Sequence, residues 1–200
     1  MAMIYLDHAA TTPVDPEVLE AMLPFFNQKF GNPSSLHSFG QEAKRAVEES
    51  REKVAKLINA KPEEIIFTSC ATESNNFALK GLLKPGDHVI TSQIEHHAVL
   101  HVCEFLEKNG VEVTYLPVDK YGLINLSELE RSIKKNTKLV SIMHANNEIG
   151  TIEPIKEIAK ICKKHGVLFH TDAVQSAGKI EIDVKKFGID LLSISSHKLY

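Results

Sequence analysis

Two side chains able to do chemistry follow aliphatic runs near the end of this 200-residue chain. Lys198 closes the run LLSISSHK (191–198), and Asp172 lies in the run HTDAVQ (170–175). Each run has the composition of a buried strand that breaks into polar residues. Ligands bind beyond the carboxyl ends of strands in an open parallel sheet, so one small molecule could contact both side chains.

The pairing of an amine with an acid limits the cofactors that such a site could serve. An amine can form an imine, and a carboxylate can keep a ring nitrogen protonated; pyridoxal 5'-phosphate (PLP) needs both groups. Each residue also has an ordinary alternative, because Asp172 could cap a helix and most lysines are solvated surface groups. The pair therefore suggests a PLP site without establishing it.

The elements that must position these residues follow the pattern of successive β-α units around a parallel sheet. Short apolar runs predict strands at Ile65–Thr68, His88–Thr91, Glu112–Leu116, Lys138–Met143, Val167–Thr171 and Leu191–Ser195. Segments of helical period predict helices at Glu73–Leu83, Ala98–Lys108, Leu126–Lys134 and Pro154–Lys164. We therefore expect an α/β fold with a mostly parallel sheet flanked by helices.

A different kind of segment precedes this array. Apolar and small residues from Phe39 to Ile58 fall on one face of a long helix, with charged residues on the other face. Turn-rich segments at 7–13 and 30–35 come before it. We predict an N-terminal arm and long helix at 1–60 that pack on a large domain, of which residues 61–200 form the first part.

The polar clusters of the chain gather at one edge of the predicted sheet. They follow successive strands and comprise Thr68–Thr72, Glu95–His96, Asn146–Glu148, Asp172 with Gln175, and Ser195–Lys198. The opposite, amino edge offers only turn residues at 61–63, 84–87 and 136–138. This asymmetry favours one ligand site at the carboxyl edge.

Residues 69–72 lead directly into a predicted helix. Their backbone N–H groups and the Thr72 hydroxyl could hold a phosphate at the positive end of the helix dipole. N-capping by Ser69 or Thr72 is the structural alternative, and the two roles are compatible. The chain contains neither G-x-x-x-x-G-K-[ST] nor G-x-G-x-x-G, which argues against nucleoside triphosphate and dinucleotide cofactors.

The ten histidines raise the question of a metal site. His97 and His101 share a helical face, but Ala98 stands where a metalloprotease would have its glutamate, so we expect no metal. His96 could instead stack on an aromatic cofactor and relay a proton. An ordinary surface histidine is the alternative at this position.

Composition excludes several classes of partner. The formal charge of −3 gives no electrostatic signature for nucleic acid, and no apolar run reaches the length of a membrane helix. The N-terminus lacks the pattern of a signal peptide, so we expect a cytoplasmic protein without nucleic-acid or membrane partners. Three widely spaced cysteines predict reduced thiols, with Cys103 and Cys162 in the core.

Five motifs together resemble the NifS/IscS-type cysteine desulfurases of the class V aminotransferase family. They are YLDHAATTP (5–13), FGNPSS (30–35), ATESNN (71–76), MHANNEIG (143–150) and SSHK (195–198). The resemblance implies the large domain of the aspartate-aminotransferase type of PLP enzyme (fold type I), without its C-terminal small domain. It also implies a homodimer that removes sulfur from L-cysteine as an enzyme persulfide, releases L-alanine and supplies an iron–sulfur scaffold protein.

The resemblance assigns roles to individual residues of this chain. Lys198 would form the internal Schiff base and take the substrate α-proton, Asp172 would bind the pyridinium nitrogen, and His96 would stack on the cofactor and handle protons. Gln175 would contact the phenolate oxygen, and Asn147 would lie near the cofactor and the substrate carboxylate. The phosphate would be held by Ala71, Thr72, Ser195 and His197.

Two residues depart from the family pattern, since Cys70 and Ser196 each stand where the family usually has Gly. Both adjoin the expected phosphate site, where Gly permits close approach or a positive φ, so PLP affinity could differ. We do not take Cys70 as the sulfur acceptor, because the family's acceptor cysteine lies on a loop expected beyond residue 200.

Two alternatives stay open at this point. The chain could be a non-catalytic fragment that binds PLP or a partner, since the acceptor cysteine, the small domain and a distal arginine are not in it. It could also represent another PLP enzyme of the same fold, such as a selenocysteine lyase or an aminotransferase.

Overall fold

The structure is a computed structural model that describes residues 4–200. Backbone contacts divide it into two compact units, which are described separately here. One unit consists of residues 68–195, and the described residues of the other are 4–67 and 196–200. The predicted boundary between 60 and 61 is not tested by this division and stays a prediction.

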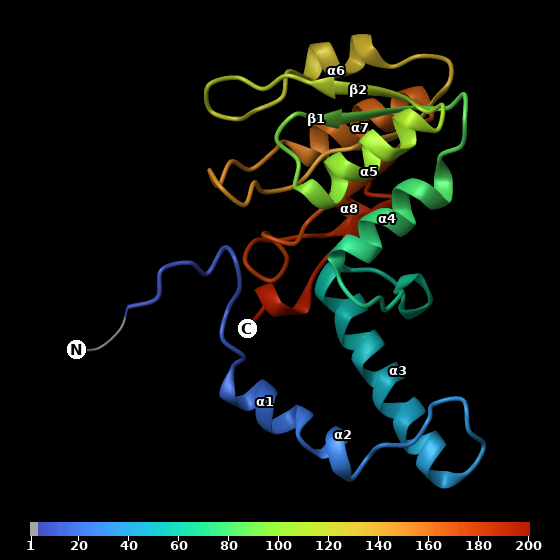
Figure 1. Cartoon of the computed structure of the whole chain (residues 1–200), viewed down its shortest axis with the longest axis vertical. Coiled ribbons are helices and arrows are strands. Elements are labelled where there is room, and N and C mark those ends of the chain that lie inside the picture. Colours follow the sequence, from blue (N-terminus) through green and yellow to red (C-terminus); the bar gives the residue numbers. More distant parts are fainter. Residues whose placement is uncertain (1–3) are drawn as a thin grey trace. The chain divides into compact units, whose positions relative to one another are not determined.

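A five-stranded parallel sheet forms the centre of unit 68–195, and its first two strands are labelled in Figure 1. Its strands are β1 (His88–Ser92), β2 (Glu112–Leu116), β3 (Thr137–Ser141), β4 (Leu168–Asp172) and β5 (Leu191–Ser193). Their order is β2-β1-β3-β4-β5, and every neighbouring pair is parallel. Five of the predicted strands and the predicted fold class are therefore confirmed.

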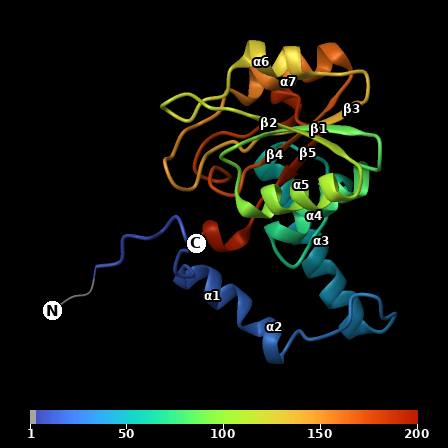
Figure 2. The same cartoon turned by 45° about the horizontal axis from the view of Figure 1, so that its top comes forward.

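Helices cover both faces of this sheet (Figure 2). The helices α4 (Ala71–Leu82) and α5 (His97–Lys108) pack together on one face. The other face carries α6 (Leu126–Ser132), α7 (Ile155–His165) and α8 (Val184–Phe187), of which α8 was not predicted. The expected end of α7 is confirmed, because Gly166 is its C-cap in the left-handed conformation, with φ 66°.

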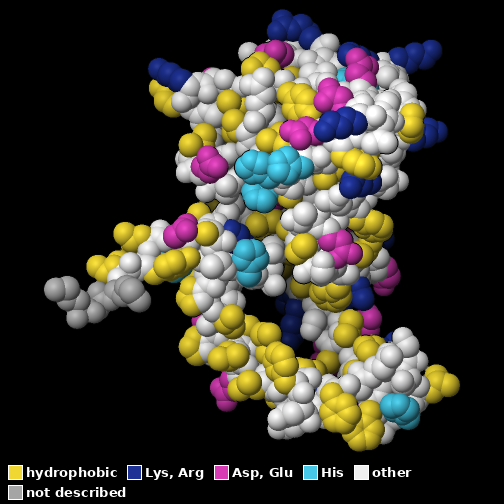
Figure 3. Space-filling model, viewed as in Figure 1, with side chains coloured by type: hydrophobic (Ala, Val, Ile, Leu, Met, Phe, Trp, Pro, Cys, Tyr) yellow, Lys and Arg dark blue, Asp and Glu magenta, His cyan; other side chains and the backbone are white. Residues whose placement is uncertain are grey.

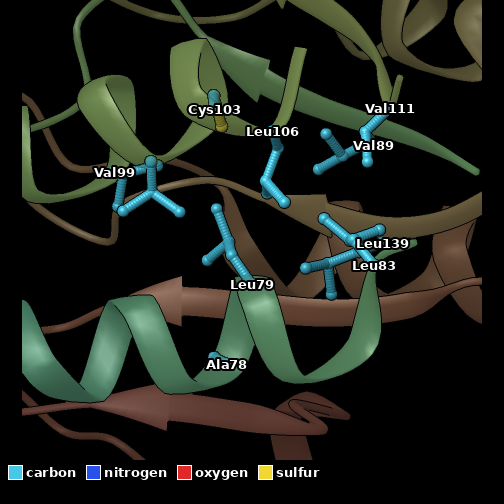
Figure 4. Close-up of a cluster of buried hydrophobic side chains, with 10 residues drawn as sticks. Ala78, Leu79, Leu83, Val89, Val99, Cys103, Leu106, Val111 and Leu139 are labelled. Carbon is cyan, nitrogen blue, oxygen red and sulfur yellow. The ribbon is translucent and has the colours of Figure 1, made fainter. Parts of the chain in front are cut away.

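The core between the sheet and the α4/α5 pair is apolar (Figure 4). Leu79 of α4 and Val99 of α5 are fully buried against Val89 of β1. Cys103 lies in the same cluster and Cys162 is buried in α7, as predicted. Burial raises the pKa of each of these two thiols to about 12, so both are inert packing groups.

The other unit begins with three helices, α1 (Pro16–Met22), α2 (Pro24–Asn27) and α3 (Ser38–Ile58). The long helix predicted from residue 39 is confirmed, and it ends at Asn59 in the left-handed conformation. The short helices α1 and α2 were not predicted. A single 3-10 turn, η1 (Pro62–Glu64), follows α3.

The strand predicted at Ile65–Thr68 is wrong. The segment pairs with no strand within residues 4–200, and an apolar run becomes a strand only when a neighbour completes its hydrogen bonds. The Arg51 side chain supplies one of the hydrogen bonds that a neighbouring strand would have supplied. Its guanidinium donates to the Ile65 carbonyl and lies 4.9 Å from the centroid of the Phe67 ring.

Candidate active site

The sheet contains a topological switch point between β1 and β3. β1 pairs with β2 on one side and with β3 on the other, so the chain turns in opposite directions after the two strands. After β1 it enters α5 on one face, and after β3 it reaches α7 on the other face. Such a point opens a crevice beyond the carboxyl ends of the strands, where ligands of α/β proteins bind.

Asp172 is the last residue of β4 and is 5% exposed. Its Oδ1 accepts a hydrogen bond from the Val174 amide at 3.0 Å, and its Oδ2 accepts one from the Asn75 side chain at 2.7 Å. The predicted burial is confirmed. The bond from the Val174 amide is the turn contact expected of a capping Asp, the alternative given above. The carboxylate that makes this bond still lies at the carboxyl edge of the sheet.

Asn75 was missed by the sequence analysis. It is fully buried in α4, and its Nδ2 holds Asp172, which lies 97 residues away in the chain. Its Oδ1 has no hydrogen-bond partner within residues 4–200. This contact places the first turns of α4 beside the end of β4, which the spacing of the two residues in sequence could not reveal.

The N-terminus of α4 does not carry the side-chain cap that the structural alternative required. Its N-cap is Cys70, which makes no side-chain capping bond, so capping by Ser69 or Thr72 is wrong. Glu73 accepts from the Ser69 amide at 2.6 Å and thereby orders the approach to the helix. Ala71 and Thr72 thus begin a twelve-residue helix whose first turn has no side-chain cap, the kind of end that binds anions.

Neither departure from the family pattern requires glycine for its backbone. Cys70 has φ −169°, which is extended backbone open to any residue, and Ser196 is not among the positive-φ residues of 4–200. The Cys70 thiol is exposed, and its pKa is lowered by the Glu73 amide and the Ser69 hydroxyl. The N-terminus of α4 therefore stabilises a negative charge on the Cys70 sulfur, and it would stabilise the charge of a phosphate for the same reason.

His96 is the N-cap of α5 and is exposed at the carboxyl end of β1. Its Nδ1 accepts from the Ala98 amide at 3.1 Å, so in the neutral ring the proton is on Nε2. The ring centroids of His96 and His97 are 6.0 Å apart, and those of His97 and His101 are 5.0 Å apart. Figure 3 shows histidine side chains grouped on this face of the molecule.

Asn147 and Gln175 follow the carboxyl ends of β3 and β4, and both are half-buried. Asn147 lies in a turn that Asn146 organises, because the Asn146 Oδ1 accepts from the amides of Glu148 (2.9 Å) and Ile149 (3.0 Å). Ser195 lies two residues beyond β5. Because the strands are parallel, these predicted site residues all lie at one edge of the sheet.

His197 and Lys198 belong to the other unit, in the 3-10 turn η2 (Ser196–Lys198). The buried Lys198 Nζ donates to the carbonyls of Ala9 and, at 2.6 Å, Ala10. Thr11 contacts the His197 ring at 3.1 Å, and burial followed by the charge of Lys198 lowers the pKa of that ring. The turn-rich segment around residues 9–12 therefore holds the Lys198 amine.

The set of groups at the carboxyl edge fits PLP. It offers a buried carboxylate for a cationic ring nitrogen, an uncapped helix N-terminus for a phosphate, and an exposed imidazole for stacking. No cluster of three or more His, Cys, Asp or Glu residues able to hold a metal ion occurs in the described part of the chain.

The chain belongs to the aminotransferase class-V family, whose sequence pattern matches residues 4–200. It is 60% identical over 201 residues to a cysteine desulfurase IscS of Dictyoglomus turgidum, covering 98% of this chain and 51% of that protein. It is 59% identical over 206 residues to a mitosomal cysteine desulfurase of Trachipleistophora hominis, covering 100% of this chain and 47% of that protein.

Solved structures give the same result. A NifS-like protein superposes with a TM-score of 0.94 at 47% identity, covering 98% of this chain and 55% of that one. SspA in complex with cysteine superposes with a TM-score of 0.93 at 46% identity, covering 97% and 57%. These matches confirm the resemblance and the fold, and the chain spans about half the length of the relatives it matches.

Proposed function

We propose that the protein containing this chain is a PLP-dependent cysteine desulfurase that releases sulfur from L-cysteine and leaves L-alanine. The observation that carries the proposal is the buried Asp172 carboxylate at the carboxyl edge, held by Asn75, in a chain 60% identical to a cysteine desulfurase. The proposed product sulfur would serve iron–sulfur cluster assembly through a scaffold protein.

In this proposal, residues of the carboxyl edge hold the cofactor. When bound, PLP supplies an electron-accepting ring that stabilises negative charge at the substrate α-carbon. Asp172 would keep the proton on the ring nitrogen, and the bond from Asn75 fixes the direction of its carboxylate. His96 would stack on the ring, and Gln175 and Asn147 would contact its polar substituents and the substrate carboxylate.

The phosphate of the cofactor would lie at the N-terminus of α4. The amides of Ala71 and Thr72 and the Thr72 hydroxyl would donate to it, with Ser195 and His197 supplying further contacts. Burial and the charge of Lys198 lower the pKa of His197 and so favour its neutral ring, which can donate a hydrogen bond to a phosphate. The exposed Cys70 thiol would adjoin this phosphate without taking part in sulfur transfer.

Lys198 is the proposed base and covalent anchor. Its Nζ, which donates to carbonyls of the 9–10 segment, would remove the proton from the substrate α-carbon. The substrate sulfur would then be attacked by a cysteine thiolate expected beyond residue 200. Because burial makes Cys103 and Cys162 inert, neither of them fits that role.

The assignment of Lys198 is tested with the whole-length protein and its Lys198→Ala variant. The purified parent is expected to carry a visible absorbance band from bound PLP and to produce alanine from cysteine. The variant is expected to lose both the band and the product. Retention of the band in a folded variant would contradict the lysine assignment.

The half-length coverage favours a second candidate for the 200-residue chain taken alone, a fragment that binds PLP or a partner without turnover. Measuring alanine and sulfide from cysteine with this chain separates the two cases. Turnover by the chain alone would exclude the inert fragment. PLP binding without turnover would support it.

A homodimer is also proposed. Within the described part of the chain, α1 and α2 bury no residue, and Phe25, Phe26 and Phe30 are all exposed, so a further surface is expected to cover them. Light scattering of the whole-length protein would give its oligomeric state.

Among residues 4–200 no helix is long and apolar enough to cross a membrane. A cytoplasmic location stays a prediction.

A further inference from the structure

Glu95 is a buried acid for which the proposed function has no role. It follows β1, directly before His96, and is 4% exposed. Its Oε1 accepts hydrogen bonds from the Ser92 hydroxyl at 2.7 Å and from the Met143 amide at 2.9 Å. Ser92 ends β1 and Met143 follows β3, so the carboxyl group joins the two strand ends across the switch point.

Asn146 makes the same connection in the opposite direction. It is buried in the turn after β3, and its Nδ2 donates to the Ile94 carbonyl, in the turn after β1, at 2.9 Å. Its Oδ1 accepts from the amides of Glu148 and Ile149 and so orders the residues around Asn147. Each turn therefore sends one buried side chain to the backbone of the other.

The position of these contacts gives them their importance. Parallel strands hold each other by backbone hydrogen bonds, but at a switch point the chains diverge toward opposite faces and no ladder continues. Beyond β1 and β3, the side chains of Glu95 and Asn146 supply hydrogen bonds in place of this backbone ladder. His96 and Asn147, which the proposed function places at the cofactor, each adjoin one of these side chains.

We propose that Glu95 and Asn146 form a reciprocal clasp that positions His96 and Asn147 before any cofactor binds. The acid acts in its neutral form: burial, opposed by its bonds to Met143 and Ser92, raises the pKa of Glu95 to about 8. No Lys, Arg or His of the described chain forms an ion pair with it. Glu95 is thus a positioning residue, and glutamine should replace it.

Hydrogen exchange in the whole-length apoprotein tests the clasp without depending on PLP chemistry. In Glu95→Ala, the amides of Ala98 and Ile149 are expected to exchange at least about tenfold faster, because neither contacts residue 95 and both rely on the two turns. In Glu95→Gln the exchange rates should stay within about threefold of the parent. Unchanged rates in a folded Glu95→Ala variant would overturn the proposal.

PLP affinity provides a second readout, which rests on the proposed function. Glu95→Ala should weaken PLP binding by about tenfold, while Glu95→Gln should restore it to within about threefold. Equal losses in both variants would show that Glu95 acts through negative charge and would overturn the clasp. If the parent itself binds no PLP, the proposed function fails while the exchange experiment still decides on the clasp.

Two further variants guard against a simple loss of folding. Asn146→Ala opens the clasp from the other side, so its effect and that of Glu95→Ala should be strongly non-additive for Ala98 exchange. Glu153→Ala is the matched control, because Glu153 is an equally buried acid that holds the Ile124 amide instead. It should lower the thermal midpoint without changing PLP affinity or Ala98 exchange. Additive effects, or an equal response of the control, would contradict the clasp.

Discussion

The two edges of the parallel sheet differ in how fully their buried polar groups are satisfied. The five buried side-chain atoms without a partner in residues 4–200 all lie at or just beyond the carboxyl edge. They are Asn75 Oδ1, Glu95 Oε2, His144 Nδ1, Glu153 Oε1 and Thr171 Oγ1. Unsatisfied buried groups destabilise a fold, so their concentration marks this edge as a whole, rather than each of these residues, as the side where another molecule could bind.

The amino edge shows the opposite condition. His88 is fully buried between the Thr137 hydroxyl at 2.7 Å and the Thr114 hydroxyl at 2.8 Å. Asp87 accepts from the Lys84 amide, and Asn136 donates to the Gly86 carbonyl. The difference indicates that the amino edge stabilises the fold, whereas the carboxyl edge carries unsatisfied groups at some cost in stability, as a binding site does.

The largest expected effect breaks the carboxyl edge at Asp172. Asp172→Asn keeps the size of the side chain but removes the charge that would hold a proton on the cofactor ring. We expect kcat of the whole-length protein to fall by about 100-fold or more, with an unchanged circular dichroism spectrum. A variant that keeps kcat within about tenfold would contradict the role of this edge.

A pH effect on stability is expected from a buried histidine in the middle of the sheet, whose ring nitrogens both have hydrogen-bond partners. His170 is fully buried between Ser141 Oγ (2.8 Å) and Ser193 Oγ (3.1 Å), and burial lowers its pKa from 6.5 to about 4. As the pH falls, His170 of the unfolded chain binds a proton before His170 of the folded chain does. Its contribution to the free energy of unfolding is therefore fully present above pH 6.5 and is lost as the pH drops toward 4. The loss is on the order of 3 kcal/mol, and urea unfolding at several pH values measures it.

The matched variant for this measurement is His170→Gln, which has no titrating ring. Its free energy of unfolding should vary less with pH between 6.5 and 4 than that of the parent. An identical slope in both proteins would show that other groups cause the acid sensitivity.

A smaller effect is expected at the amino edge. The Thr137 hydroxyl accepts from the Lys134 amide at 2.7 Å and contacts the buried His88 ring. Thr137→Val removes the partner of the Lys134 amide and of His88 Nδ1, and should lower the free energy of unfolding by about 1–3 kcal/mol. The kcat of the folded variant should not change, and a large loss of kcat would remove the distinction between the edges.

The smallest effect is expected on the exposed surface near that edge. Glu130 contacts Lys164 at 2.6 Å and His165 at 3.0 Å, and all three side chains are exposed to solvent. Exposed ion pairs contribute little because water screens both charges. Glu130→Ala should therefore leave the denaturant midpoint and kcat unchanged within error, and a clear shift in either would contradict this view.

Much of the fold could be predicted because local patterns define it. Apolar runs separated by amphipathic segments predicted all five strands of the sheet and the helices α3 to α7. The strand at Ile65–Thr68 was wrong because a strand depends on a partner that no local pattern reveals. The helices α1 and α2 have seven and four residues, too few for their apolar side chains to show a helical period in the sequence.

The candidate site could be predicted only in part. Polar residues directly after strands were found, since parallel strands bring their carboxyl ends together. Asn75 was missed because its partner is remote in sequence. Glu95 was placed at the carboxyl edge but was given no role, because its bond to the Met143 amide joins residues 48 positions apart. Their roles follow from burial and hydrogen bonds, which exist only in the folded chain.

Hydrogen exchange of the whole-length protein with and without PLP tests the contrast between the edges most directly. PLP is expected to protect carboxyl-edge segments 70–76, 93–98, 143–149 and 172–176. Amino-edge segments 84–88, 134–138 and 165–168 should exchange at unchanged rates. Protection at the amino edge, or none at the carboxyl edge when PLP is bound, would contradict the account.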